Sequence, residues 1–104
     1  MDTQKYYDMI RLNHYPKKRV ETCETCGRQH LAESDKERFF KELDIYHQRE
    51  RAILDLFKSD LLEDLGLENH PKADLLYSMA WEHGHALGFN DVVCWAENLA
   101  QLLK

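Results

Sequence analysis

Two cysteines separated by two residues are the clearest chemical signal in the sequence. Cys23 and Cys26 lie within VETCETCGR, residues 20–28. This spacing is typical of a zinc knuckle, because a tight turn points both thiolates at one ion, and Gly27 permits the conformation that follows the second ligand. Basic residues flank the pair and would offset its negative charge: Lys17, Lys18, Arg19 and Arg28. We therefore predict a structural zinc site.

Tetrahedral zinc needs four ligands, and the sequence has no second such pair. His30, at C-x2-C-x3-H spacing, is the nearest third ligand, and His14 is the candidate fourth. More remote candidates are His70, His83, His85 and Cys94. Two alternatives stay open: a zinc ion shared between two copies in a homodimer, each donating Cys23 and Cys26, or a reduced pair without metal. A redox pair is disfavoured, because thioredoxin-like motifs follow a strand in a βαβ pattern that is missing here.

Enzymatic chemistry has weaker support in the sequence. Glu82 with His85, and Asp44 with His47, have the spacing of the Glu-x-x-His pairs of di-iron bundles. One pair begins with Asp, however, and the further inward-facing glutamates cannot be identified. His83 and His85 would point roughly 200° apart on a helix, so they could not share a metal there. Since the sequence also lacks a nucleophile elbow and a phosphate loop, we predict that the protein is not an enzyme.

Helices must position these residues. Apolar periodicity predicts a first helix over 3–13, which Pro16 prevents from continuing. A second amphipathic helix is predicted from 35 to about 65, ending at Gly66. Residues 14–33 between them are predicted to be a loop that carries the cysteines.

The start of the second helix has a capping signal. Ser34 and Glu37 have the spacing of a capping box. The apolar stripe that follows includes Phe39, Leu43, Tyr46, Ile53 and Phe57, widened by Phe40, Leu54 and Leu61. Ser59-Asp60 could cap a separate helix, so a break near Lys58 is an alternative to one continuous helix.

A helical hairpin is predicted over 71–103. Pro71 suits a first helical position, with Asn69 or His70 as the cap. Gly88 offers a left-handed turn at the end of that helix, and Asn90 can cap a last helix over 91–103. The apolar faces are Ala73, Leu76, Tyr77, Ala80, Gly84 and Leu87, then Val93, Ala96, Leu99, Ala100 and Leu103. The fold class is therefore all-α: a single domain over 1–104, forming a small helical bundle with a zinc-knuckle insert between the first and second helices.

Composition and charge narrow the function. The 104 residues are 43% hydrophobic and 32% charged, with a net charge of −5, which argues against wholesale disorder. Residues 1–33 carry a net +1 and residues 34–104 a net −6, so a partner with a basic surface is favoured over broad nucleic-acid binding. No apolar run is long enough for a membrane span, and the first residues lack the pattern of a secretory signal, so we expect a cytoplasmic protein without membrane contact.

Two elements could contact nucleic acid or protein. The spacing Gly84-x3-Gly88-Phe89-Asn90-x3-Cys94 is similar to a helix-turn-helix core. The would-be reading helix has two acids and no Lys or Arg before Lys104, so DNA would repel it. The basic segment Lys17, Lys18 and Arg19 is a better candidate for nucleic acid, and Trp81 and Trp95 are candidate anchors for a protein partner.

The segment AWEHGHALGFNDV, residues 80–92, followed by AENLAQLL, residues 96–103, carries a resemblance. It resembles the C-terminal A-W-E-x-G-H-x-x-G-x-x-x-V stretch of small, mostly uncharacterised bacteriophage proteins. The resemblance implies a phage-encoded accessory product that acts in a bacterial cytoplasm, commonly by binding a host protein. It implies no catalytic residue.

The sequence thus leads to one expected function and one alternative. We expect a small accessory protein that modulates or inhibits a host macromolecule by stoichiometric docking, with a structural zinc ion held by Cys23, Cys26, His30 and His14. The alternative is a transcriptional regulator that binds nucleic acid through the basic knuckle.

Overall fold

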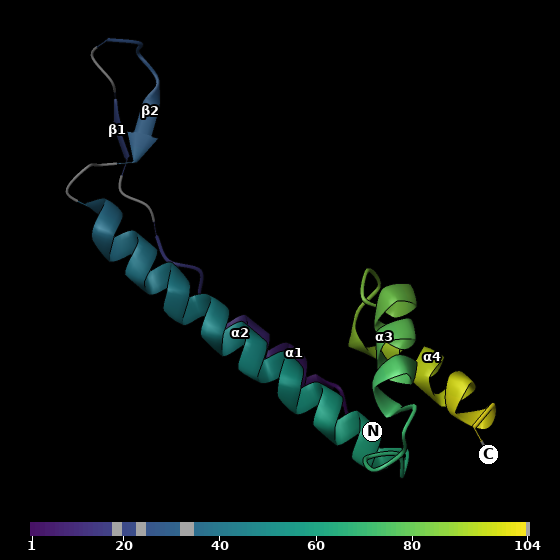
Figure 1. Cartoon of the computed structure of the whole chain (residues 1–104). Coiled ribbons are helices and arrows are strands. Elements are labelled where there is room, and N and C mark those ends of the chain that lie inside the picture. The colour runs from purple at the N-terminus through teal and green to yellow at the C-terminus, as the bar shows by residue number, and fades with distance from the viewer. Residues whose placement is uncertain (18–19, 23–24, 32–34, 104) are drawn as a thin grey trace.

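A single long helix, α2 (Lys36–Asp64), runs along most of the molecule, and the other elements are arranged along it (Figure 1). The structure, a computed structural model, describes residues 1–17, 20–22, 25–31 and 35–103, with only the backbone for 20–22 and 29–31. It measures 65 × 24 × 21 Å, with a radius of gyration of 19.2 Å. A compact chain of this length would have a radius of gyration of about 13 Å. The molecule is therefore elongated.

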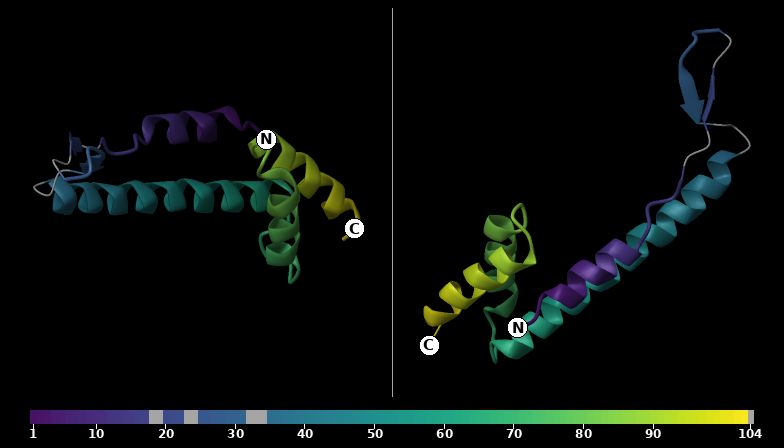
Figure 2. Two further views of the ribbon diagram at one scale, coloured as in Figure 1. Left: turned by 90° about the horizontal axis from the view of Figure 1, so that it is seen from above. Right: turned by 180° about the vertical axis from the view of Figure 1, so that it is seen from behind.

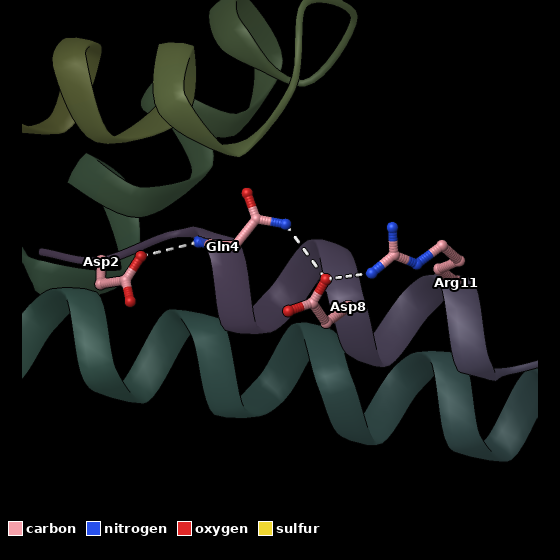
Figure 3. A network of polar contacts seen from close by, with 4 residues as sticks. All are labelled: Asp2, Gln4, Asp8 and Arg11. Carbon is pink, nitrogen blue, oxygen red and sulfur yellow. Dashed lines mark hydrogen bonds and ion pairs between the residues drawn. The ribbon is translucent and has the colours of Figure 1, made fainter.

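Helix α1 (Gln4–Leu12) lies antiparallel alongside α2 (Figure 2). At the end of α1, the Asn13 side-chain amide donates a 3.1 Å hydrogen bond to the Tyr46 carbonyl of α2. The outer face of α1 carries a chain of exposed polar contacts from Asp2 through Gln4 and Asp8 to Arg11 (Figure 3). Because these contacts join residues two to four apart, they stabilise the helix locally rather than form a site.

The insert between α1 and α2 contains a β-hairpin, where the sequence predicted only a loop. Strand β1 (Val20–Thr22) pairs antiparallel with β2 (Gln29–Leu31), and Thr22 lies opposite Gln29 at the turn. This hairpin projects beyond the N-terminal end of α2 (Figure 1). Gly27 has a φ of 70°, a left-handed conformation that glycine adopts without the strain a side chain would cause.

Helices α3 (Ala73–Gly84) and α4 (Phe89–Gln101) form a tight hairpin at the other end of α2. The two helices approach closely at Gly84. A Cβ atom there would lie 2.6 Å from the backbone nitrogen of Val92, so only glycine fits without moving α4.

The hydrophobic core lies where all four helices meet. Tyr6 of α1, Phe57 of α2 and Phe89 of α4 form its aromatic centre, with ring centroids 4.7–5.7 Å apart. Leu76 and Ala80 of α3 complete it from the remaining side. The N-terminal half of α2 lies outside this core, which is why the molecule is elongated.

The helix content agrees with the all-α prediction, and the helix boundaries differ in detail. Helix α2 continues through Lys58 without a break. Helix α3 begins two residues after Pro71, and the imidazole Nδ1 of His70 accepts a 3.0 Å hydrogen bond from the backbone N–H of Lys72. Ser34, and with it the predicted capping box, lies outside the described residues.

The predicted start of the last helix is wrong. Helix α4 begins at Phe89 with Gly88 as its N-cap, so Asn90 is not the cap. Asn90 instead accepts a hydrogen bond from the Thr3 hydroxyl, which joins the start of α1 to α4. Gly88 adopts φ 114° and ψ −178°, a conformation outside the left-handed helical region that the prediction assumed. Leu87, predicted to face the core, is exposed because it lies in the turn after α3.

Candidate functional site

Of the predicted zinc ligands, Cys26 and His14 are fully described in the structure. Cys26 is exposed in its turn, and His14 is exposed beside Glu42 and Tyr46 of α2. Cys23 and the side chain of His30 lie outside the described residues. Within the part of the chain that is described, no three His, Cys, Asp or Glu side chains form a group that could hold a metal ion. The zinc site therefore stays a prediction.

The more remote metal candidates are at the opposite end of the molecule. His70, His83, His85 and Cys94 all follow the C-terminal end of α2, whereas the cysteine turn lies beyond its N-terminal end. Even His85 lines a cavity with Glu50, which is separated from the start of α2 by 14 residues, or about 21 Å of helix. None of these four side chains can complete a site with Cys26 in the same molecule.

Of the predicted nucleic-acid contacts, Lys17 is exposed, and Lys18 and Arg19 lie outside the described residues.

The two tryptophans have different surroundings. Trp81 is half-buried and stacks on His85, with centroids 5.7 Å apart and planes 13° apart. Trp95 is 41% exposed and stacks on His83, with centroids 4.6 Å apart. The two imidazoles thus pack on separate indole rings, in agreement with the prediction that the side chains of residues 83 and 85 point in different directions.

An apolar groove runs between α3 and α4. Its volume is about 200 Å³, and it is lined by Lys72, Leu75, Leu76, Met79, Leu99, Leu102 and Leu103. Leu75 is 59% exposed and Leu102 is 79% exposed, so each leaves a large apolar surface in contact with water. Sequence reasoning missed this groove. The available signal was the adjacent pairs Leu75-Leu76 and Leu102-Leu103, because two consecutive helical residues cannot both face the core.

The groove belongs to the acidic end of the molecule. Residues 52–104 contain nine Asp or Glu and three Lys or Arg, a net charge of −6, which exceeds the −5 of the whole chain. Lys58 is already paired with Asp74 at 2.9 Å. A basic partner would therefore be attracted to this end of the molecule.

A second cavity lies at the meeting of the four helices. Its volume is about 350 Å³, and it is lined by Tyr7, Ile10, Glu50, Leu54, Trp81, His85, Gly88 and Phe89. The rings of Tyr7 and Phe89 meet edge to face at 5.0 Å. Glu50 is the one carboxylate among these lining residues. Because each helix or its flanking turn supplies only part of the wall, spacing along the chain could not have predicted this cavity.

A polar contact between α1 and α2 stabilises the fold. The buried Tyr6 hydroxyl donates a hydrogen bond to Asp60, and Lys5 lies 3.1 Å from the same carboxylate. The hydrogen bond from Tyr6, together with Lys5, lowers the pKa of Asp60, whereas burial and then Asp60 raise the pKa of Tyr6. Because the three side chains satisfy one another's hydrogen-bonding and charge requirements between α1 and α2, we interpret them as structural.

Comparison with known proteins places most of the chain in one family. Residues 4–104 match the model described as "Family of unknown function (DUF8546)". No curated protein and no solved structure matches the chain. In the described part of the chain, no helix combines the length and the apolar character needed to cross a membrane.

Proposed function

This chain belongs to DUF8546, a family of unknown function, and we propose that it is a small accessory protein that binds a host macromolecule stoichiometrically through the α3–α4 end. The observation that carries the proposal is the apolar groove with its exposed leucines, set in the acidic end of the molecule. The resemblance of residues 80–92 to small bacteriophage proteins supports a bacterial host partner in the cytoplasm.

The groove suits an amphipathic helix with a basic outer face. Covering the exposed parts of Leu75 and Leu102 would each contribute about 1–2 kcal/mol, because 59% and 79% of their surfaces are now exposed. The leucine and methionine walls would accept apolar residues spaced three and four apart on the partner helix. The net negative charge of residues 52–104 would attract the basic face of the partner, whereas the one charged residue in the groove lining is Lys72.

Matched leucine variants test this proposal. Leu102→Asp places a charge in the groove, whereas Leu87→Asp changes an equally exposed leucine, 79% in both cases, that does not line it. Tagged wild-type protein is used to isolate partners from bacterial lysate, and the partner is then purified and titrated by calorimetry. We expect one-to-one binding that Leu102→Asp weakens at least tenfold and Leu87→Asp leaves unchanged.

Two results would contradict the groove proposal. Equal binding by both leucine variants would exclude the groove as the contact. Binding of labelled DNA or RNA whose affinity falls steeply with salt would instead favour the nucleic-acid alternative.

The β-hairpin supports a separate proposal, a structural zinc ion. Cys26 and Gly27 lie in the turn after β1, and Gly27 has the positive φ that a Cys-x2-Cys-Gly knuckle requires. The thiolates of Cys23 and Cys26 would hold the ion, completed by His30 and His14 or by the same two cysteines of a second copy. The ion would supply folding energy to the insert.

Metal analysis with a matched cysteine control tests the zinc proposal. We expect protein-bound zinc that Cys26→Ser removes and that Cys94→Ser retains, since Cys94 is also exposed but lies on α4. One zinc per chain would indicate the histidine-completed site, and one zinc per dimer would indicate the shared site. Protein purified with added zinc but containing none would refute the proposal.

A further inference from the structure

The cavity between the four helices is lined mainly by aromatic and aliphatic side chains, with Glu50 as its one carboxylate. Tyr7 and Phe89 contribute aromatic rings from α1 and α4, and Trp81 stacks on His85 beside them. Ile10 and Leu54 supply aliphatic surface. At about 350 Å³ it falls within the size range of small-ligand sites, and it could hold one long side chain.

Glu50 supplies the one negative charge among the residues that line this cavity. Among the described residues, no Lys or Arg forms an ion pair with Glu50. Its carboxylate accepts a hydrogen bond from the hydroxyl of Tyr46, whose pKa is raised by burial, then by the charge of Glu50 and by this hydrogen bond. Within the described part of the chain, a cation entering the cavity would therefore meet a carboxylate that has a neutral hydrogen-bond partner and no ion-pair partner.

The imidazole at the rim is arranged to accept a hydrogen bond. His85 Nδ1 lies 2.7 Å from the Trp81 carbonyl oxygen, and a carbonyl can only accept. Nδ1 therefore carries a proton, and in the neutral ring Nε2 is an acceptor. A donor with several N–H groups could use both this nitrogen and the Glu50 carboxylate.

We propose that this cavity binds an arginine side chain of the partner protein. The planar guanidinium stacks on aromatic rings, its five N–H donors match the carboxylate and imidazole acceptors, and its aliphatic stem suits Ile10 and Leu54. The assignment to a partner rests on the proposed docking function. Trp81 lies six residues after Leu75 on α3, so the cavity and the groove lie on different faces of that helix. The arginine would therefore make a second contact of the partner, separate from its contact with the groove.

The test uses the whole chain and two small probes. The variant Trp95→Phe leaves Trp81 as the single tryptophan, so its fluorescence reports on the cavity. N-acetyl-arginine amide is the ligand, and N-acetyl-citrulline amide is the neutral control of the same shape. In this background Glu50→Gln removes the charge, and Glu82→Gln removes an exposed carboxylate beside Trp81 that does not line the cavity.

We expect a saturable change in Trp81 emission with the arginine probe in the millimolar range, as is usual for so small a ligand. Binding should be at least about tenfold weaker for the citrulline probe and for Glu50→Gln, and unchanged for Glu82→Gln. Equal binding of both probes, full affinity in Glu50→Gln, or no saturable change in a variant whose far-ultraviolet circular dichroism is native would overturn the inference.

These outcomes are separable from those of the groove test. If Leu102→Asp abolishes partner binding but the arginine titration fails, the cavity assignment alone is wrong. If arginine binds and no partner depends on Leu102, the proposed docking function alone is wrong.

Discussion

Replacing Gly84 with alanine should destabilise the protein even though alanine is the better helix former. In an open helix this change stabilises by up to about 1 kcal/mol. Here the added Cβ would lie 2.6 Å from the Val92 nitrogen and 2.8 Å from its Cα, both backbone atoms. Ordinary contact begins at 3.4 Å, so α4 would have to move by roughly 0.8 Å.

The net effect follows from the competition between helix propensity and overpacking. Overpacking of a close contact costs about 1–3 kcal/mol, and a backbone neighbour that cannot rotate away places Gly84 at the upper end of this range. After the propensity gain is subtracted, we expect a loss of about 2 kcal/mol in the free energy of unfolding, which corresponds to a fall in Tm of roughly 10 °C.

Urea unfolding followed by far-ultraviolet circular dichroism measures this loss. Ser78→Ala is the matched control, because Ser78 is exposed on the same helix and its replacement tests helix propensity alone. We expect this control to be as stable as the wild type or slightly more stable. If Gly84→Ala is as stable as Ser78→Ala, the close approach of α3 and α4 is not a constraint and the reasoning fails.

Three further predictions concern the contacts around the core. Gly88→Ala should lower the unfolding midpoint in urea, because the φ of 114° at this position disfavours a side chain and the new Cβ would collide with the Tyr7 hydroxyl. Adding Tyr7→Phe removes the collision and should restore part of the loss. The pKa of Asp60 is lower in the folded protein than its unfolded value near 4, so the ionised carboxylate stabilises the fold above that pH and the stabilisation is lost progressively as the pH falls below it. Urea titrations at pH 2–5 should show a smaller dependence on acid for Tyr6→Phe than for the wild type. Burial raises the pKa of Tyr77 to about 12, so the neutral phenol contributes fully to the free energy of unfolding below about pH 10, and this contribution should be lost as the pH rises toward 12. A Tyr77→Phe variant that unfolds in base like the wild type would contradict this.

Helix positions were largely predictable because their signals are local. Pro16 and Gly66 mark the region where α1 and α2 end, and the apolar stripe of residues 39–61 has the period of a helix. The two β-strands were not predictable, since three residues each are too few for a periodic signal. The start of α4 was predicted at residue 91, with Asn90 as the cap, but Thr3, which is 87 residues away, uses the Asn90 side chain.

The candidate sites were less predictable than the helices. The sequence singled out Trp81 as a contact residue, and it does line a cavity. It offered no reason to group Trp81 with Tyr7 or Glu50, and it did not predict that Leu75 and Leu102 share a groove. Of the zinc ligands, Cys23 and the His30 side chain are not described, so that prediction awaits metal analysis.

The sequence by itself determined the helical character, the acidic C-terminal half and the glycines at which the chain turns, since each depends on residues that are neighbours along the chain. Only the tertiary structure decided that α2 extends as a spine, with the cysteine turn at one end and the α3–α4 hairpin at the other. It also decided that Tyr7, Glu50 and Trp81 enclose one cavity. The reason is physical: periodicity specifies which face of a helix is apolar, whereas the partner of that face depends on how side chains distant in sequence fit together.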